Sequence, residues 1–306
     1  MTSYFFTNEG EIVLFKFAIS CCSTVDLTAN KLKSRNVNWI SFPVVLNGKQ
    51  FKDDMFSTLS PKEYYDNLLK GNVTTTSQIN VEEYNEHFEK LLKEYSEVVH
   101  VSMSSNLSGT YNNAITSAKG LNAKYKNKHV YVINSLCTSS GYGMLVEMLA
   151  DLRDKGLTAF EAVNYCEDIK HKIHTDFFVS DLNFLVKGGR VSKASAIVGN
   201  ILKIFPILFI NADGKLELRK KVRGKNMAFD DLINNMLNNC NGAKKYDGKC
   251  FVSHSDCEQD AKRLIDLIEG TFPNLKGKVE LFSIGPTTGS HTGPHTLALF
   301  YIGNER

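Results

Sequence analysis

Hydroxyl side chains cluster at two places where an apolar, strand-like run meets a helix-like stretch. "SSNLSGTYNNA" (Ser104–Ala114) follows one such run, and "TTTSQIN" (Thr74–Asn80) precedes another helical pattern in the same manner. A strand that passes through a Ser/Gly turn into a helix brings hydroxyls and free backbone N–H groups to one point, which favours an anion. Both clusters therefore predict an anion site, and helix capping is the alternative for each.

The two clusters name specific candidates. Ser104 and Ser105 leave the first apolar run and Gly109 permits close packing, so we expect Ser105 to donate to a bound carboxylate or phosphate. In the second cluster the candidates are Thr76, Ser77 and Asn80, with a loop and cap as the alternative. Two such clusters on one sheet edge would converge on one ligand.

A glycine pair and a histidine pair stand later in the chain. "KGGRVSK" (Lys187–Lys193) lacks the spacing of an ATP-binding loop, so we expect a tight turn with Arg190 either structural or facing the ligand. His291 and His295 are four residues apart, but Gly-Pro between them breaks a helix, which argues against zinc. His291 either donates to an anion or is a core residue.

Neither a disulfide framework nor an activated nucleophile is evident. The seven cysteines are an odd set without repeated C-x-x-C spacing, which favours a reducing cytoplasm. Cys137 and Ser140 lie near a strand end, but neither has an identifiable base. Catalysis is therefore unsupported, although it stays open.

Composition favours a soluble globular protein. Of 306 residues 42% are hydrophobic and 23% charged, and no apolar run approaches the roughly 18 residues of a membrane span. A net charge of +3 is too small to indicate nucleic acid.

Residues 187–225 hold ten Lys/Arg against two acids, which predicts a solvated basic face or a surface for an acidic or phosphorylated partner. Within it, alternation in "KLELRKKVR" predicts an outward stripe of Arg219, Lys221 and Arg223.

Strand-like and helical patterns alternate through the first half, which predicts a parallel sheet covered by helices. The expected strands are Phe15–Cys22, Asn38–Leu46, Glu97–Ser104 and His129–Ser135, and the expected helices are Pro61–Lys70, Val81–Tyr95, Ser108–Lys119 and Ser140–Lys155. We place two α/β domains at residues 15–174 and 175–306, with the ligand in the crevice between them. Residues 1–14 are a poor secretory signal and form an atypical leader or an extra strand.

Six motifs together resemble the DegV family in order and spacing, from about Phe15 onward. They are "CCSTVDL" (Cys21–Leu27), "TTSQ" (Thr75–Gln78), "SSNLSGTY" (Ser104–Tyr111), "LVKGGRVS" (Leu185–Ser192), "GNILKIFPIL" (Gly199–Leu208) and "IGPTTGSHTGPHTLALF" (Ile284–Phe300). The resemblance implies a two-domain α/β protein that binds one long-chain fatty acid between its domains and presents the carboxylate to a fatty-acid kinase. It implies Thr76 and Ser105, with Ser104 beside it, as the carboxylate contacts, together with His291 and Arg190.

The resemblance also implies a non-catalytic lipid-binding subunit in the cytoplasm, with no cofactor, no nucleic acid and at most transient contact with a membrane surface. A hydrolase or transferase acting in the same crevice is the alternative. Two residues depart from the family pattern: Cys22 stands where the family's D-S-T has its acid, and His295 stands where the family has glycine.

Overall fold

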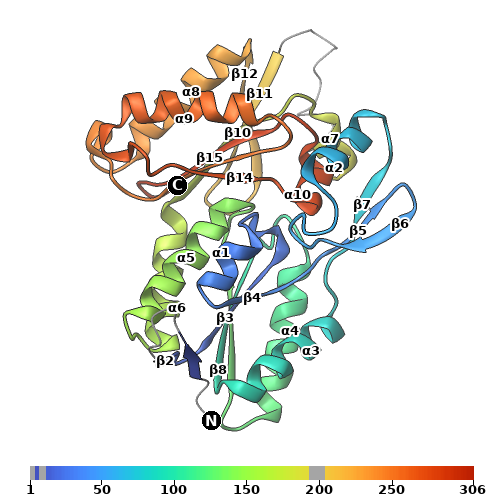
Figure 1. Ribbon diagram of the computed structural model, residues 1–306, viewed down its shortest axis with the longest axis vertical. Coiled ribbons are helices and arrows are strands. Elements are labelled where there is room, and N and C mark those ends of the chain that lie inside the picture. Colours follow the sequence, from blue (N-terminus) through green and yellow to red (C-terminus); the bar gives the residue numbers. More distant parts are fainter. Residues whose placement is uncertain (1–3, 7–11, 193–203) are drawn as a thin grey trace.

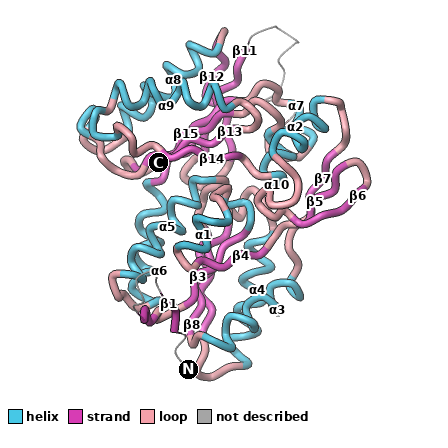
Figure 2. The backbone as a smooth tube through the Cα atoms, viewed as in Figure 1, coloured by secondary structure: helices cyan, strands magenta, loops and turns pink. Residues whose placement is uncertain are grey.

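The computed structural model describes residues 4–6, 12–192 and 204–306. The chain forms two α/β halves, each built around its own sheet (Figure 1). Strands run through the middle of the molecule and most helices lie on the outside (Figure 2). The predicted fold class, two α/β units of which the first has a parallel sheet, is confirmed.

The first half contains a four-stranded parallel sheet in the order β4-β3-β8-β9. The strands are β3 (Ala18–Cys22), β4 (Val37–Ile40), β8 (Glu97–Ser102) and β9 (His129–Asn134). The helices of this half are α1 (Ala29–Ser34), α3 (Val81–Glu94), α4 (Thr110–Lys124), α5 (Ser140–Asp154) and α6 (Ala159–Ile169), with the 3-10 turns η1 (Ser23–Val25) and η2 (Lys170–Lys172). Helices α3 and α4 lie on one side of the sheet and α5 and α6 on the other (Figure 1). Both faces are thus covered, as parallel strands require.

One predicted strand, Asn38–Leu46, is wrong because the structure divides it. Its first part is β4, and its second part, β5 (Pro43–Leu46), belongs to a separate antiparallel sheet with β6 (Lys49–Lys52) and β7 (Thr74–Thr76). Proline cannot donate a ladder hydrogen bond and restricts the residue before it, so the chain turns away at Pro43. The Phe42 amide donates instead to the Ser23 hydroxyl at 3.1 Å.

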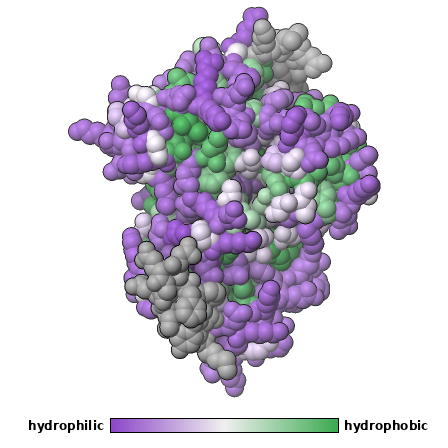
Figure 3. Space-filling view, viewed as in Figure 1, coloured by the Kyte–Doolittle hydropathy of each residue, from purple (hydrophilic) through white to green (hydrophobic). Residues whose placement is uncertain are grey.

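The small sheet and α2 (Pro61–Leu69) project to one side of the molecule (Figure 1). Helix α2 begins with a capping box between Ser60 and Glu63. Two large apolar side chains at and just after the end of α2 are unusually exposed, Leu69 at 55% and Val73 at 70%. Figure 3 shows polar groups over most of this face, with apolar groups gathering at the edge where α2 and β7 lie.

The second half holds a six-stranded mixed sheet in the order β12-β11-β10-β15-β13-β14. Its strands are β10 (Ile173–Phe178), β11 (Ile204–Ile210), β12 (Leu216–Arg223), β13 (Cys250–His254), β14 (Glu280–Ser283) and β15 (Leu297–Ile302). Its helices are α7 (Asn183–Lys187), α8 (Lys225–Asn239), α9 (Glu258–Thr271) and α10 (Pro286–Thr292), with the 3-10 turns η4 (Ala243–Lys245) and η5 (Pro273–Leu275). Strand β10 already belongs to this sheet, and the predicted domain boundary after residue 174 lies within its first two residues. The boundary itself stays a prediction.

One apolar core joins the two halves. It includes Val99 and Leu145 from the first half and Phe177 and Phe300 from the second. Helix α5 packs against β10, β13 and β15 as well as against its own sheet. A second core cluster lies under α8 and α9 on the other face of the six-stranded sheet.

The predicted outward cationic stripe is wrong for Arg219. The register of β12 shifts there, because Leu208 pairs with Leu218 whereas Ile207 pairs with Lys220. Such a bulge redirects the side chain. Arg219 pairs with the buried carboxylate of Asp176, and its guanidinium stacks 4.9 Å from the Phe209 ring centroid.

The amino-terminal segment adds two short strands to the fold. Strands β1 (Tyr4–Phe6) and β2 (Ile12–Leu14) pair antiparallel, in line with the extra-strand interpretation of residues 1–14. Within the described ranges, no helix is long and apolar enough to cross a bilayer.

Candidate ligand-binding site

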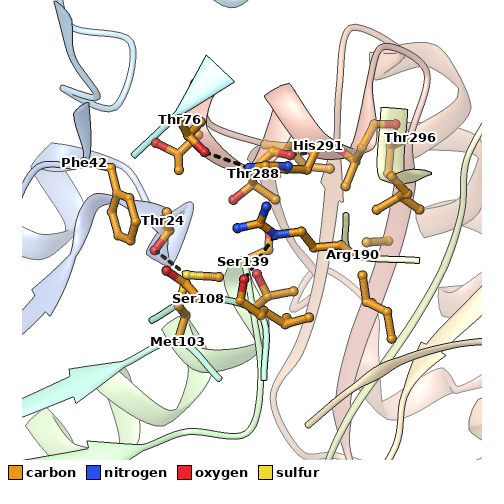
Figure 4. Close-up of a pocket in the computed structure, with 18 of the residues that line it drawn as sticks. Thr24, Phe42, Thr76, Met103, Ser108, Ser139, Arg190, Thr288, His291 and Thr296 are labelled. Carbon is orange, nitrogen blue, oxygen red and sulfur yellow. Dashed lines mark hydrogen bonds between the residues drawn. The ribbon is translucent and has the colours of Figure 1, made fainter. Parts of the chain in front are cut away.

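A cavity of about 350 Å³ lies between the two halves, and both of them line it. We call it the inner cavity. Its apolar wall includes Phe42, Met103 and Leu107 from the first half and Phe177 and Phe300 from the second. Figure 4 shows how side chains from several elements converge on this space. The apolar composition of the wall suits a ligand with a long apolar part.

A hydrogen-bonded pair closes one end of the inner cavity. The Thr76 hydroxyl lies at the end of β7, 2.8 Å from Nε2 of His291 on α10. The two residues come from opposite halves of the chain, and the bond between them is drawn in Figure 4. The structure thus brings together two of the residues that the sequence predicts for an anion.

Arg190 brings a cation to the same end. It follows α7 and the turn at Gly188 and Gly189, and Gly189 has a positive φ of 72°. The guanidinium is held by backbone carbonyls, since Nε donates to Leu107 at 3.1 Å and Nη1 donates to Gly188. Because these carbonyls carry no full charge, the positive charge of Arg190 is not neutralised by them. Arg190 lines the inner cavity together with Thr76 and His291.

Burial keeps the His291 imidazole neutral. Desolvation, with a further contribution from the charge of Arg190, lowers the pKa of His291 to about 4. At neutral pH one ring nitrogen therefore donates and the other accepts. If Nε2 carries the proton, it donates to Thr76 and leaves the threonine hydroxyl free to donate into the cavity.

Two buried polar atoms on α10 have no hydrogen-bond partner of good geometry among the described residues: Oγ1 of Thr288 and Nδ1 of His291. The Thr288 hydroxyl is near enough to Asp26 to lower the pKa of that carboxyl, but it makes no well-aligned bond. Both residues line the inner cavity. Unpaired buried polar atoms are uncommon in native proteins and require an explanation, which a ligand oxygen near Thr288 would supply.

The structure places Ser104 and Ser105 off the inner cavity, and the predicted contact of either residue with a carboxylate stays a prediction. The Ser104 hydroxyl is buried and donates to the Gly214 carbonyl at 2.8 Å. The Ser105 hydroxyl accepts from the Asn134 amide at 2.8 Å. Neither residue lines the inner cavity, because the turn after β8 points both side chains toward the β9 and β11–β12 connections. The serine of this motif that lines the cavity is Ser108, immediately before Gly109.

Gly109 explains why the second hydroxyl cluster can approach the first. A β-carbon at Gly109 would lie 2.3 Å from Oε1 of Gln78, so a larger residue here would displace the Gln78 side chain. Asn113 on α4 reinforces it by donating to the Ile79 carbonyl at 2.8 Å. Asn80 accepts from the Glu83 amide and caps α3, which is the alternative expected for it.

Most other hydroxyls on the cavity wall are already engaged by the protein. Thr24 bonds the Tyr142 hydroxyl at 2.7 Å, Thr287 donates to Asp53, and Thr296 donates to the Thr292 carbonyl at 3.0 Å. Such groups need no partner from a ligand. The wall is therefore less polar than its residue types suggest, and unmet hydrogen-bonding capacity concentrates on α10.

Two buried carboxyls from the first half hold α10 in place. Asp26 accepts from the Gly285 amide at 2.9 Å, and Asp53 accepts from the Thr287 amide at 3.2 Å. Burial, with a smaller contribution from the nearby Asp53, raises the pKa of Asp26 to about 8. The sequence patterns predicted no role for these two acids. Asp26 does stand in the "CCSTVDL" motif, which is the signal that could have indicated it.

The departures from the family pattern also have a place in the structure. Burial raises the pKa of the Cys22 thiol to about 12, and its sulfur lies 3.3 Å from the Tyr84 hydroxyl. Cys22 therefore stays a neutral thiol away from the inner cavity, which its neighbour Thr24 lines.

Helix α10 ends at Thr292, just before the Gly-Pro pair that was expected to break a helix, and His295 lies beyond it with a φ of 60°. No group of three or more His, Cys, Asp or Glu in the described part of the chain is placed to hold a metal ion.

These features define a class: α/β proteins of two halves, each built around its own main sheet, with a cavity lined by both halves. A model of the family described as "Uncharacterised protein, DegV family" matches residues 16–304, so the chain belongs to the DegV family. A DegV domain-containing protein of Clostridium perfringens is 30% identical over 295 residues, covering 95% of this chain and 99% of that protein.

Solved structures of the family agree with the fold. A DegV lipid-binding protein from Thermotoga maritima is 27% identical, with a TM-score of 0.81 over 95% of this chain and 99% of that one. A fatty-acid-binding DegV family protein from Streptococcus agalactiae is also 27% identical, with a TM-score of 0.80 over 95% of this chain and 100% of that one.

Proposed function

We propose that this protein binds one long-chain fatty acid in the inner cavity and presents its carboxylate to a fatty-acid kinase. The observation that carries the proposal is the largely apolar cavity between the halves, whose lining includes Thr76, His291 and Arg190. The lipid- and fatty-acid-binding relatives support the ligand class. The kinase step rests on what the family resemblance implies.

The apolar wall supplies most of the affinity in this proposal. Each buried methylene contributes about 0.8 kcal/mol, so a chain of some sixteen carbons gives on the order of 12 kcal/mol before ordering costs. A carboxylate without partners in such a space would be costly. Thr76, Thr288 and Arg190 meet that requirement at one end.

The headgroup arrangement follows from the tautomer of His291. A carboxylate accepts a hydrogen bond from the Thr76 hydroxyl, and that hydroxyl accepts one from Nε2–H of neutral His291. Arg190 adds a charge–charge attraction. Ser108 also lines the inner cavity, and we propose it in place of Ser105 as the serine of the site.

A hydrolase or transferase is the second candidate, because Thr76 and His291 form a hydroxyl–imidazole pair. Two observations weigh against it. With a pKa of about 4, His291 is a weak base at neutral pH, and no described carboxylate accepts from its Nδ1 to orient it. We therefore assign a carrier role in which the chemistry is performed by the partner. The seven free thiols fit work in the reducing cytoplasm.

Mass spectrometry of lipid extracted from the purified protein tests the proposal. We expect about one intact long-chain fatty acid per chain, displaced by added fatty acid and weakly by its methyl ester, which lacks the charge. Turnover of an added ester, with no bound acid, would instead establish the enzyme. Acyl-phosphate formation with a fatty-acid kinase and ATP tests the presentation step separately.

A further inference from the structure

A second cavity of about 410 Å³ lies on the outer side of the headgroup end. We call it the outer cavity. It shares Thr76, Arg190 and His291 with the inner cavity, so these three residues form a wall that is lined from both sides. The two cavities therefore meet at these side chains.

The outer cavity has the chemistry of an anion site. Lys187, at the end of α7, contributes a second cation beside Arg190, and Asn72 and Thr75 add polar groups. No Asp or Glu is among the described residues that line it. Two cationic side chains without a carboxylate beside them favour a phosphoryl group over a neutral or cationic ligand.

The rim of the outer cavity adds an apolar surface. Val73 lines the cavity and is 70% exposed. Leu69, the last residue of α2, is 55% exposed. Exposed apolar side chains beside a cationic pocket suit a protein partner that carries a phosphate group.

We propose that the outer cavity receives the γ-phosphoryl group of a nucleoside triphosphate held by the kinase, with Lys187 as its main charge contact. This inference rests on the proposed function. A carboxylate oxygen attacks the γ-phosphorus, forming the acyl O–P bond. The bond from that phosphorus to the β–γ bridging oxygen breaks, and the nucleoside diphosphate leaves with the electron pair. Lys187 neutralises the charge on the transferring group.

The test uses the full chain loaded with palmitic acid, a purified fatty-acid kinase subunit, ATP and Mg²⁺. We expect Lys187→Gln to lower kcat/KM for acyl-phosphate formation about tenfold or more, because a hydrogen bond to a charged group is lost. Fatty-acid affinity should stay within about twofold, since charge removed outside the wall is screened. Lys187→Arg should restore most activity, and Val73→Glu should lower it by placing a carboxylate at the rim.

Lys70→Gln is the matched control, because Lys70 is an exposed lysine at the end of α2 that does not line the outer cavity. It should change the rate less than about twofold. Full activity of Lys187→Gln would overturn the outer-cavity assignment while leaving presentation intact. Loss of fatty-acid binding in that variant would also overturn it, by placing Lys187 in the carboxylate contact. No acyl phosphate from the wild-type protein would instead refute presentation itself.

Discussion

At the scale of single residues, the site depends on which hydroxyls are free and which are engaged. Thr76 pairs with a neutral imidazole at the cavity wall, whereas Ser105 accepts from Asn134 outside it. Both belong to hydroxyl clusters that look alike in the sequence. The difference arises from tertiary contacts, because β7 is brought to α10 by a sheet that the hydrophobic pattern did not predict.

We expect Thr76→Val to weaken fatty-acid binding by roughly 1.5–3 kcal/mol, because valine keeps the shape and removes the hydrogen bonds to a charged group. Ser105→Ala is the paired control and should leave the dissociation constant nearly unchanged. Titration with one fatty acid measures both, and thermal melting checks that each variant is folded. A larger loss of affinity in Ser105→Ala than in Thr76→Val would favour Ser105 as the carboxylate contact.

Asp26 makes stability depend on pH. Its folded pKa of about 8 exceeds the ordinary value of 3.8, so the folded state retains a proton that the unfolded chain releases between these values. The stabilisation is complete below about pH 4 and is lost as the pH rises through 8. Asp26→Asn keeps an acceptor for Gly285 and tolerates the left-handed backbone there.

The measurement is the melting temperature of both proteins from pH 5 to pH 9. We expect the wild type to lose stability relative to Asp26→Asn as the pH rises across this range. A constant difference between the two curves would show that Asp26 does not titrate there.

At the scale of elements, periodicity predicted what local sequence controls and missed what distant contacts decide. The parallel strands β3, β8 and β9 and the helices α2, α3 and α5 were predicted to within a few residues, because their apolar spacing and capping residues are local. The division at Pro43 and the bulge at Arg219 were missed, since each depends on pairing with a strand elsewhere.

Five residues were named for the site: Thr76, Arg190 and His291 line the inner cavity, whereas Ser104 and Ser105 do not. Whether any of them contacts a ligand stays a prediction.

Helix α10 offers an element-scale test, because it carries both Thr288 and His291. A β-carbon at Gly289 would lie 2.3 Å from the Tyr65 hydroxyl, which donates to the Ile284 carbonyl at 2.6 Å. Gly289→Ala should therefore destabilise the fold by about 1–3 kcal/mol and weaken ligand binding as α10 shifts.

Gly120→Ala is its control, since this exposed glycine inside α4 has no atom within 4 Å of the added carbon. It should stabilise the protein by roughly 0.5–1 kcal/mol, the usual gain for alanine in a helix. Urea unfolding measures both variants. Equal effects of the two substitutions would argue against close packing of α10 on α2.

At the scale of the whole molecule, the inner cavity belongs to neither half alone. Phe42 and Met103 line it from the first half and Phe177 and Phe300 from the second, and one apolar core continues between them. A ligand that fills this space therefore contacts both halves at once. Its binding should stabilise the entire chain, and not a single domain.

Thermal unfolding measures this coupling directly. Fatty acid at 100 times its dissociation constant adds about 2.7 kcal/mol to the stability of any unit that must unfold to release it. Because both halves line the cavity, we expect one cooperative transition that moves upward as a whole, together with a negative heat-capacity change on binding from apolar burial. The methyl ester keeps the chain but loses the attraction to Arg190, so it should produce a smaller shift at equal concentration. Two transitions of which only one responds to fatty acid would contradict this, because the ligand would then contact one half without depending on the other.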